Sequence, residues 1–219
     1  RARYETLYDG VFYRRYILGE WCLAEGLIYP FDKDSHVVTE LPEELNQGHG
    51  EWYISCDYGT LNPFSAGLWW VHNGRAIRVD EYYYSGRGSS VMKTDEEYYT
   101  ELENLAGDRA IRCVIVDPSA ASFIAALRKR GFTVQKANNE VIDGIRRTSV
   151  YLKEGKILIH RNCADAIREF GLYRWDEKST EDKVVKENDH AMDEIRYFCN
   201  TVLKHKFKQD NNYKPKFMM

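Results

Sequence analysis

Three apolar runs close together in the first half of the sequence constrain the fold more than any other feature. They cover residues 51–57, 65–71 and 76–84. The second and third runs are separated by His72-Asn73-Gly74-Arg75, and an Asn-Gly pair between alternating apolar runs is a strong signal of a β-hairpin. The sequence therefore predicts an antiparallel meander of three strands in this region.

The second half of the sequence alternates between helix and strand patterns. An apolar run at 111–117 is continuous, as in a strand that is buried on both faces. Thr94 and Glu97 have the spacing of a capping box, which predicts a helix start at residue 94. Further helices are expected at 119–130, 140–153, 163–172 and 190–204, and further strands at 132–136 and 156–160. A meander followed by such units predicts an α/β fold with a ribonuclease H-like mixed sheet flanked by helices.

Composition excludes several classes of protein. With 219 residues, 43% of them hydrophobic and 30% charged, the chain has the profile of a globular protein with one domain of ordinary size and extra segments. No apolar run approaches the roughly 18 residues of a membrane-spanning helix, and no signal-peptide pattern opens the chain. The five cysteines are far apart and form no zinc-binding pair, which favours a reducing, cytoplasmic setting. The net charge of −3 argues against a tight, sequence-specific DNA-binding module, but it does not exclude a nuclease.

Two aspartates follow apolar runs that are expected to be strands. Asp57 ends the first run of the meander, and Asp117 ends the run at 111–117. A third acid, Asp193, lies near the start of the last expected helix. Carboxylate oxygens are the ligands that hard cations such as Mg²⁺ prefer, and two strand-borne acids plus one from a late helix is the layout of two-metal nucleases. We expect Asp57 to bridge two ions about 3.5–4 Å apart, while Asp117 and Asp193 each complete one coordination shell.

Each of these acids also has a purely structural interpretation. Asp57 is a common turn former, and Asp117 precedes a proline, where extended backbone is favoured. For Asp193 the residues alone favour the structural interpretation. The last helix has a clear apolar stripe, and Asp193 points nearly opposite to it, which predicts a solvated position. The stripe consists of Ala191, Ile195, Phe198 and Val202.

Four other residues close to the third acid are candidates for the same site. His190 shares a helix flank with Asp193 and is either a further metal ligand or an exposed first-turn residue. Asp189 is expected to be the N-cap of the last helix rather than a ligand. The charged segment 176–188 is a solvated loop or short hairpin, or else a flap that brings Lys183 and Lys186 to a DNA phosphate.

Three short segments together resemble a known family. They are 53–65, which contains Asp57-Tyr58-Gly59-Thr60, then 116–120, and then 188–197. In this order they are similar to motifs of the C-terminal nuclease domain of the terminase large subunit of tailed bacteriophages. The stretch 18–30 resembles the linker that joins the ATPase domain of that family to its nuclease. The resemblance covers residues 1 to 204.

The resemblance implies a function and a domain organisation. It implies a ribonuclease H-like endonuclease that uses two Mg²⁺ or Mn²⁺ ions and cuts concatemeric viral DNA during genome packaging in the host cytoplasm. The small terminase subunit, the portal and double-stranded DNA are the implied partners. The chain starts at Arg1 within an apparent helix, so we interpret 1–45 as a linker remnant after an absent ATPase domain, 46–205 as the nuclease domain and 206–219 as a basic, flexible tail. We expect the isolated fragment to be a monomer.

Two other functions remain open at this stage. The pattern Asp-x-Gly-Thr at 57–60 also occurs in the first phosphate-binding motif of actin-like and sugar-kinase ATPases, although those proteins need a second glycine-rich motif that is not found here. The chain also has no complete phosphate loop, since Gly155-Lys156 is followed by Ile157. We therefore expect no ATPase activity. The other alternative is a non-catalytic module that docks on the packaging motor.

Overall fold

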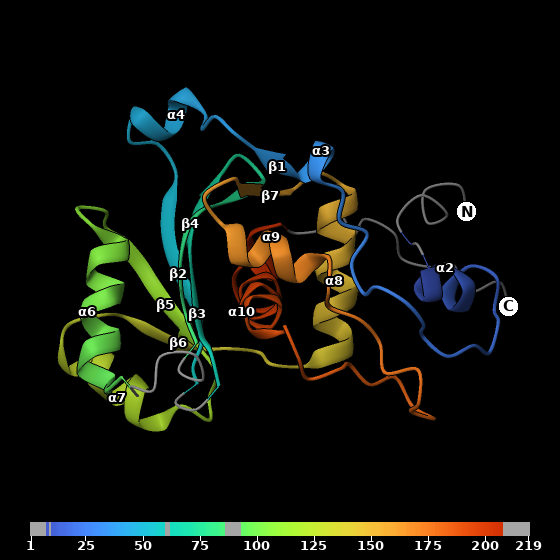
Figure 1. Cartoon of the computed structure of the whole chain (residues 1–219). Helices are drawn as coiled ribbons and strands as arrows, with labels where there is room; N and C mark the ends of the chain where they lie inside the picture. Colours follow the sequence, from blue (N-terminus) through green and yellow to red (C-terminus); the bar gives the residue numbers. More distant parts are fainter. Residues whose placement is uncertain (1–7, 9, 60–61, 86–92, 208–219) are drawn as a thin grey trace, which may run out of the picture.

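A single seven-stranded sheet organises the chain (Figure 1). The structure, a computed structural model, describes residues 8, 10–59, 62–85 and 93–207. The strand order in the sheet is β1-β7-β4-β3-β2-β5-β6. The strands are β1 (Val37–Val38), β2 (Glu51–Asp57), β3 (Phe64–His72), β4 (Arg75–Tyr84), β5 (Ile111–Val116), β6 (Val134–Lys136) and β7 (Ile157–His160). Strands β2, β3 and β4 are antiparallel neighbours, and all other pairings are parallel, so the predicted meander and mixed sheet are confirmed.

The turn between β3 and β4 has the geometry that its Asn-Gly pair predicts. Asn73 and Gly74 have φ angles of 47° and 73°, and the flanking His72 and Arg75 are paired across the hairpin. Positive φ at both central positions is the mark of a type I′ turn, whose twist matches that of the flanking strands. The turn therefore fixes the register of β3 against β4.

Helices cover both faces of the sheet (Figure 1). One face carries α6 (Asp95–Ala106) and α7 (Ala121–Lys129), and the other carries α8 (Val141–Lys153), α9 (Ala164–Phe170) and α10 (His190–Phe198). In β2, Tyr53 belongs to the apolar cluster of the α10 face, whereas Ile54 and Cys56 belong to the cluster of the α6 face. Because successive side chains in a strand alternate between faces, Ser55 and Asp57 lie on the side of α10.

The expected helices and strands of residues 94–172 are all present, with ends that differ by a few residues. At the start of α6, the Thr94 hydroxyl accepts a hydrogen bond from the backbone of Glu97, and the Glu97 carboxylate accepts one from the backbone of Thr94. The predicted capping box is therefore confirmed.

The first 50 residues differ more from expectation. The helix expected at the start of the chain is described as α2 (Gly10–Tyr16), and residues 1–7 and 9, where the sequence predicts its beginning, lie outside the described residues. The stretch 31–50, where the sequence predicts no helix or strand, contains α3 (Lys33–His36), β1 and α4 (Glu43–Asn46), and β1 pairs with β7. Elements of two to four residues are too short to produce a periodic pattern, which explains why the sequence did not reveal them.

The last helix is not uniform. It is α-helical from His190 to Phe198, becomes a π-helix at Cys199–Leu203 and ends with α11 (Lys204–Lys206). Lys206, assigned above to the flexible tail, forms an ion pair with Glu51. The tail residues 208–219 lie outside the described residues, so the division into linker, nuclease domain and tail stays a prediction.

Two further expectations from the sequence concern the cysteines and membrane-spanning helices. The five cysteines are free thiols, and four of them are buried. Within the part of the chain that the structure describes, no helix has the length and apolar character needed to cross a membrane.

The hairpin turn provides a direct test of the fold. Replacing Gly74 with Ala should lower the free energy of unfolding by about 1–2 kcal/mol, because an L-residue is strained at positive φ. A Cβ at Gly74 has no atom within 4 Å, so the backbone angle alone is tested. Gly171→Ala is the matched control, since Gly171 has a φ of −84° and should change stability by less than about 0.5 kcal/mol. Urea denaturation measures both, and equal effects would contradict the assignment of the turn.

Candidate functional site

The first two acids lie side by side at one edge of the sheet. Strands β2 and β5 are parallel neighbours, and Cys56 is in register with Val116. Asp57 is the last residue of β2, and Asp117 follows β5 directly. Neighbouring strands are about 4.8 Å apart, so the two aspartates start from adjacent positions. The sequence-based expectation that the two strand ends meet is therefore met in the fold.

The third acid lies in a buried helix, which corrects the solvated position that its helical periodicity predicts. Helix α10 packs against β2, β3, α8 and α9, and every residue from Ala191 to Phe198 is buried. Asp193 is only 6% exposed and borders the same cleft as Asp57. A helix enclosed on all sides has no solvated face, so its apolar stripe does not reveal which polar residues are buried.

Asp57 is paired with the candidate ligand His190. The Nδ1 atom of His190 lies 2.8 Å from Oδ2 of Asp57. Burial raises the pKa of Asp57 above its ordinary value, and the nearby Asp193 carboxylate adds to this effect, while the hydrogen bond to His190 opposes it. Burial acts to lower the pKa of His190, but the contact with Asp57 outweighs it, so the pKa of His190 is raised. The contact thus favours the ionised form of Asp57 and the protonated form of His190.

Asp193 is held by two cations of the chain itself. Its Oδ1 atom accepts a hydrogen bond of 2.8 Å from Arg196, one helical turn further on. Its Oδ2 atom lies 3.0 Å from the ammonium group of Lys186, which also lies 3.2 Å from Asp189. Burial acts to lower the pKa of Lys186, but the carboxylates of Asp193 and Asp189 outweigh it, so the pKa of Lys186 is raised. Lys186, proposed from the sequence as a phosphate contact, thus contacts a candidate metal ligand.

Asp189 occupies the N-cap position of α10, but its carboxylate makes no capping hydrogen bond. The side chain faces Lys186 instead, and Asp189 is 4% exposed. The expected role as an N-cap is therefore correct for the position and wrong for the hydrogen bond. The reason is conformational, because Asp189 has φ and ψ angles of −120° and −2° and not the extended backbone from which an N-cap side chain reaches the first turn.

Asp117 is oriented by Ser119 of its own motif and by Asn139, which the sequence motifs did not indicate. Its Oδ1 atom accepts a hydrogen bond of 2.8 Å from the backbone of Ser119, and its Oδ2 atom accepts one of 3.1 Å from Asn139. Burial acts to raise the pKa of Asp117, but these hydrogen bonds outweigh it and its pKa is lowered. The pKa shift of Asp117 is thus opposite to that of Asp57.

Tyr197 lies within the electrostatic influence of all three acids. It is 5% exposed, and burial raises its pKa. The carboxylates of Asp57, Asp193 and Asp117 raise the pKa further. The phenol is therefore neutral at physiological pH.

An open cleft of about 700 Å³ lies over Asp57 and Asp193. Its walls also contain Lys186, Asp189, His190, Arg168, Tyr83 and Asn62. Asp117 is not among the lining residues, and Lys183 is exposed outside the cleft. The segment 176–188 is joined to the chain before it by a bridge between Trp175 and Val184, so a short hairpin-like loop leads into the cleft.

The donor chemistry of this site fits a hard divalent cation, although its side chains are arranged around other partners. Among the described residues, no three His, Cys, Asp or Glu side chains are placed to hold one ion together. Two of the three candidate ligands, Asp57 and Asp193, nevertheless line one open cleft, and a cation of the chain already lies against Asp193. Oxygen donors of this kind suit Mg²⁺ or Mn²⁺. Binding would require exchange of the lysine ammonium for the ion.

Comparison with known proteins agrees with the sequence motifs. No protein-family model matches the chain. It is 25% identical over 126 residues to the terminase large subunit of Escherichia phage T5, a match that covers 54% of this chain and 29% of that protein. The large terminase of a thermophilic bacteriophage, solved in complex with ADP, is 50% identical, with a TM-score of 0.87, and the match covers 92% of this chain and 51% of the other. The chain thus spans about half the length of that large terminase.

Two solved nuclease domains show which part of such a protein has this fold. The nuclease domain of the P22 large terminase has a TM-score of 0.65 at 18% identity, covering 84% of this chain and 98% of that domain. The nuclease domain of the bacteriophage SPP1 large terminase, solved with bound Mn, has a TM-score of 0.54 at 18% identity, covering 74% and 94%. The predicted ribonuclease H-like fold is therefore confirmed. The chain resembles the bacteriophage terminase large subunit in sequence, and its fold is that of the nuclease domain of that subunit.

Proposed function

We propose that this chain is a metal-dependent endonuclease that cuts double-stranded, concatemeric viral DNA during genome packaging. The observation that carries the proposal is the convergence of Asp57 and Asp193 on one open cleft, with Asp117 on the neighbouring strand, in a fold shared with terminase nuclease domains. The cleft is open enough to admit a phosphodiester backbone. Little sequence preference is expected, because the chain has no evident base-reading helix.

Three carboxylates would hold two divalent ions in this mechanism. Asp57 has the central position, since it is coupled electrostatically to Asp193 and starts beside Asp117. This supports its role as the bridging ligand, with Asp117 and Asp193 each completing one site. When bound, two such ions supply an activated water and stabilise the leaving 3′-oxygen. The SPP1 domain was solved with bound Mn, which supports Mg²⁺ or Mn²⁺ as the cofactor here.

The chain's own residues have to change partners before the acids can bind metal. His190 would release Oδ2 of Asp57, and Lys186 would release Oδ2 of Asp193. Arg196 can stay, because its hydrogen bond to Oδ1 leaves the cleft side of Asp193 free. A released Lys186 would lie at the wall of the cleft, where it can contact a phosphate. His190 would then act either as a further ligand or as a hydrogen-bond donor beside the ions.

The partners follow from the proposed packaging role. Double-stranded DNA is the substrate, and an ATPase domain upstream in the same polypeptide, the small terminase subunit and the portal complete the motor. We propose that the 219-residue fragment acts as a monomer in the host cytoplasm and does not hydrolyse ATP.

Removing any of the three acids tests the catalytic assignment. Asp57→Ala, Asp117→Ala and Asp193→Ala should each abolish nicking of supercoiled plasmid in Mn²⁺, because each ion loses a carboxylate ligand. Asp143→Ala is the control, since Asp143 is an exposed acid on α8 that pairs with Arg146 of the same helix. An ATP-turnover assay run beside it should show no activity. A fully active Asp57→Ala would contradict the assignment of the metal site, and a fully active Asp193→Ala would limit the site to the sheet.

Metal binding should stabilise the domain through the same acids. Millimolar Mn²⁺ is expected to raise the melting temperature, because an ion that binds only the folded state shifts the equilibrium toward it. The effect should be much smaller in Asp57→Ala and larger in Lys186→Ala, which has lost the competing cation. Differential scanning calorimetry with and without Mn²⁺ gives these shifts, and equal shifts in all three proteins would place the ion elsewhere.

The two lysines of segment 176–188 should differ in their contribution to DNA binding. Lys186→Ala should weaken binding and lower the slope of log affinity against log salt by about 1, as expected for the loss of one phosphate contact. Lys183→Ala is the matched control, because Lys183 is exposed outside the cleft. Fluorescence anisotropy between about 50 and 200 mM salt measures both. If neither lysine changed the slope, segment 176–188 would be a solvated loop without a role in DNA binding.

A further inference from the structure

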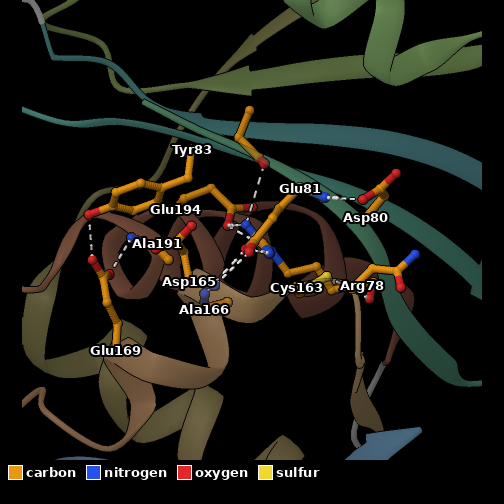
Figure 2. Close-up of polar contacts among 12 residues, drawn as sticks. Arg78, Asp80, Glu81, Tyr83, Cys163, Asp165, Ala166, Glu169, Ala191 and Glu194 are labelled. Atoms are coloured by element: carbon orange, nitrogen blue, oxygen red, sulfur yellow. Dashed lines mark hydrogen bonds and ion pairs between the residues drawn. The ribbon is translucent and has the colours of Figure 1, made fainter. Parts of the chain in front are cut away.

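Beside Asp193, helix α10 carries a second acid that has no part in the cleft. Glu194 is completely buried and points into the face of the sheet (Figure 2). Its Oε2 atom lies 3.1 Å and 3.0 Å from the Nε and Nη2 atoms of Arg78 on β4. Its Oε1 atom accepts hydrogen bonds from the hydroxyl of Ser55 and, at 3.0 Å, from the indole of Trp69. One carboxylate therefore connects α10 with all three strands of the meander.

The sheet leaves room for this ion pair at a glycine. A Cβ atom on Gly67 of β3 would lie 2.4 Å from Nε of Arg78 and 2.6 Å from Oε1 of Glu194. Any other residue would displace the pair. Arg78 is itself fully buried and also contacts Glu81, whose carboxylate accepts hydrogen bonds from the backbone at the start of α9 (Figure 2).

The network joins two of the candidate metal ligands by a short path. Ser55 lies two residues before Asp57 on the same face of β2. Glu194 follows Asp193 directly in α10. The hydrogen bond between Ser55 and Glu194 therefore sets the position of α10 along the strand that ends in Asp57, and the contact with Arg78 prevents the helix from sliding across the sheet.

Stability alone gives a poor account of such an arrangement. Burying an ion pair removes two charges from water, and apolar residues of the same volume often serve stability equally well or better. We propose that Glu194 is a positioning residue, which holds Asp193 at the distance from Asp57 that two shared ions require. This inference rests on the proposed function, because it assumes that the two acids bind metal together.

Affinity for Mn²⁺, measured by isothermal titration calorimetry on the 219-residue chain, tests this role separately from stability. Glu194→Gln should weaken binding about tenfold, the effect typical for loss of a group that orients a metal ligand. Ser55→Ala should weaken binding in the same direction at nearly unchanged melting temperature, because Trp69 still donates to Glu194. It therefore remains informative if Glu194→Gln does not fold.

Glu81→Gln is the matched control. It removes a carboxylate that pairs with the same arginine, Arg78, but that makes no contact with α10 in the network described above. It should lower the melting temperature but change the Mn²⁺ affinity by less than about twofold. Wild-type affinity in both Ser55→Ala and Glu194→Gln, while Asp57→Ala no longer binds Mn²⁺, would overturn the inference and leave the metal site standing. Equal weakening by Glu81→Gln would also overturn it, because the effect would then follow stability. A wild-type chain that binds no Mn²⁺ would overturn the proposed function itself.

Discussion

The burial of α10 against the meander is the contact on which the candidate site depends. The charged side chains of so buried a helix need partners of opposite charge, because an unpaired charge in the interior costs several kcal/mol. Glu194 is paired with Arg78 and Asp193 with Arg196, and the carboxylate of Glu169 in α9 accepts the backbone N–H of Ala191 (Figure 2). These pairings determine the rotation and the position of the helix, which an apolar interface alone would leave less well defined. The packing of α10 on the sheet therefore determines where Asp193, the third acid, lies.

The acids at the cleft are compensated by cations that belong to the chain. Without metal, carboxylates this close to one another would repel, and the pKa of Asp57 is raised by burial and by the charge of Asp193. His190 and Lys186 reduce that repulsion by direct contact. Under the proposed function, a divalent ion would replace the Lys186 ammonium group beside Asp193. A lysine on a loop suits such an exchange, because its ammonium group hydrates readily once it is displaced.

The accuracy of the sequence-based prediction varies with the range of the interactions that define each element. The meander follows from alternating apolar runs and an Asn-Gly turn, and helix α6 follows from its capping box, all of which are signals within a few residues. The two-residue strand β1 is defined by its pairing with β7, so no local sequence pattern predicts it. The π-helix at Cys199–Leu203 likewise has no local signature, and its Asn200 and Thr201 pair with the distant Asn138.

Sequence alone determined that Asp57 and Asp117 each end a strand, because a strand end is a local feature. Parallel strands present their carboxyl ends at one edge of a sheet, so two such acids can come together there. It also determined the order of the motifs through which the family resemblance was identified. Only the tertiary structure decided where Asp193 lies, since helical periodicity distinguishes one apolar side from one polar side and fails for a helix with protein on all sides. The contacts of Lys186 and Glu194 were likewise decided only by the tertiary structure. Glu194 pairs with Arg78, which is 116 residues away, and Lys186 contacts Asp193 from a loop outside the helix, so both contacts form only after the layers have packed.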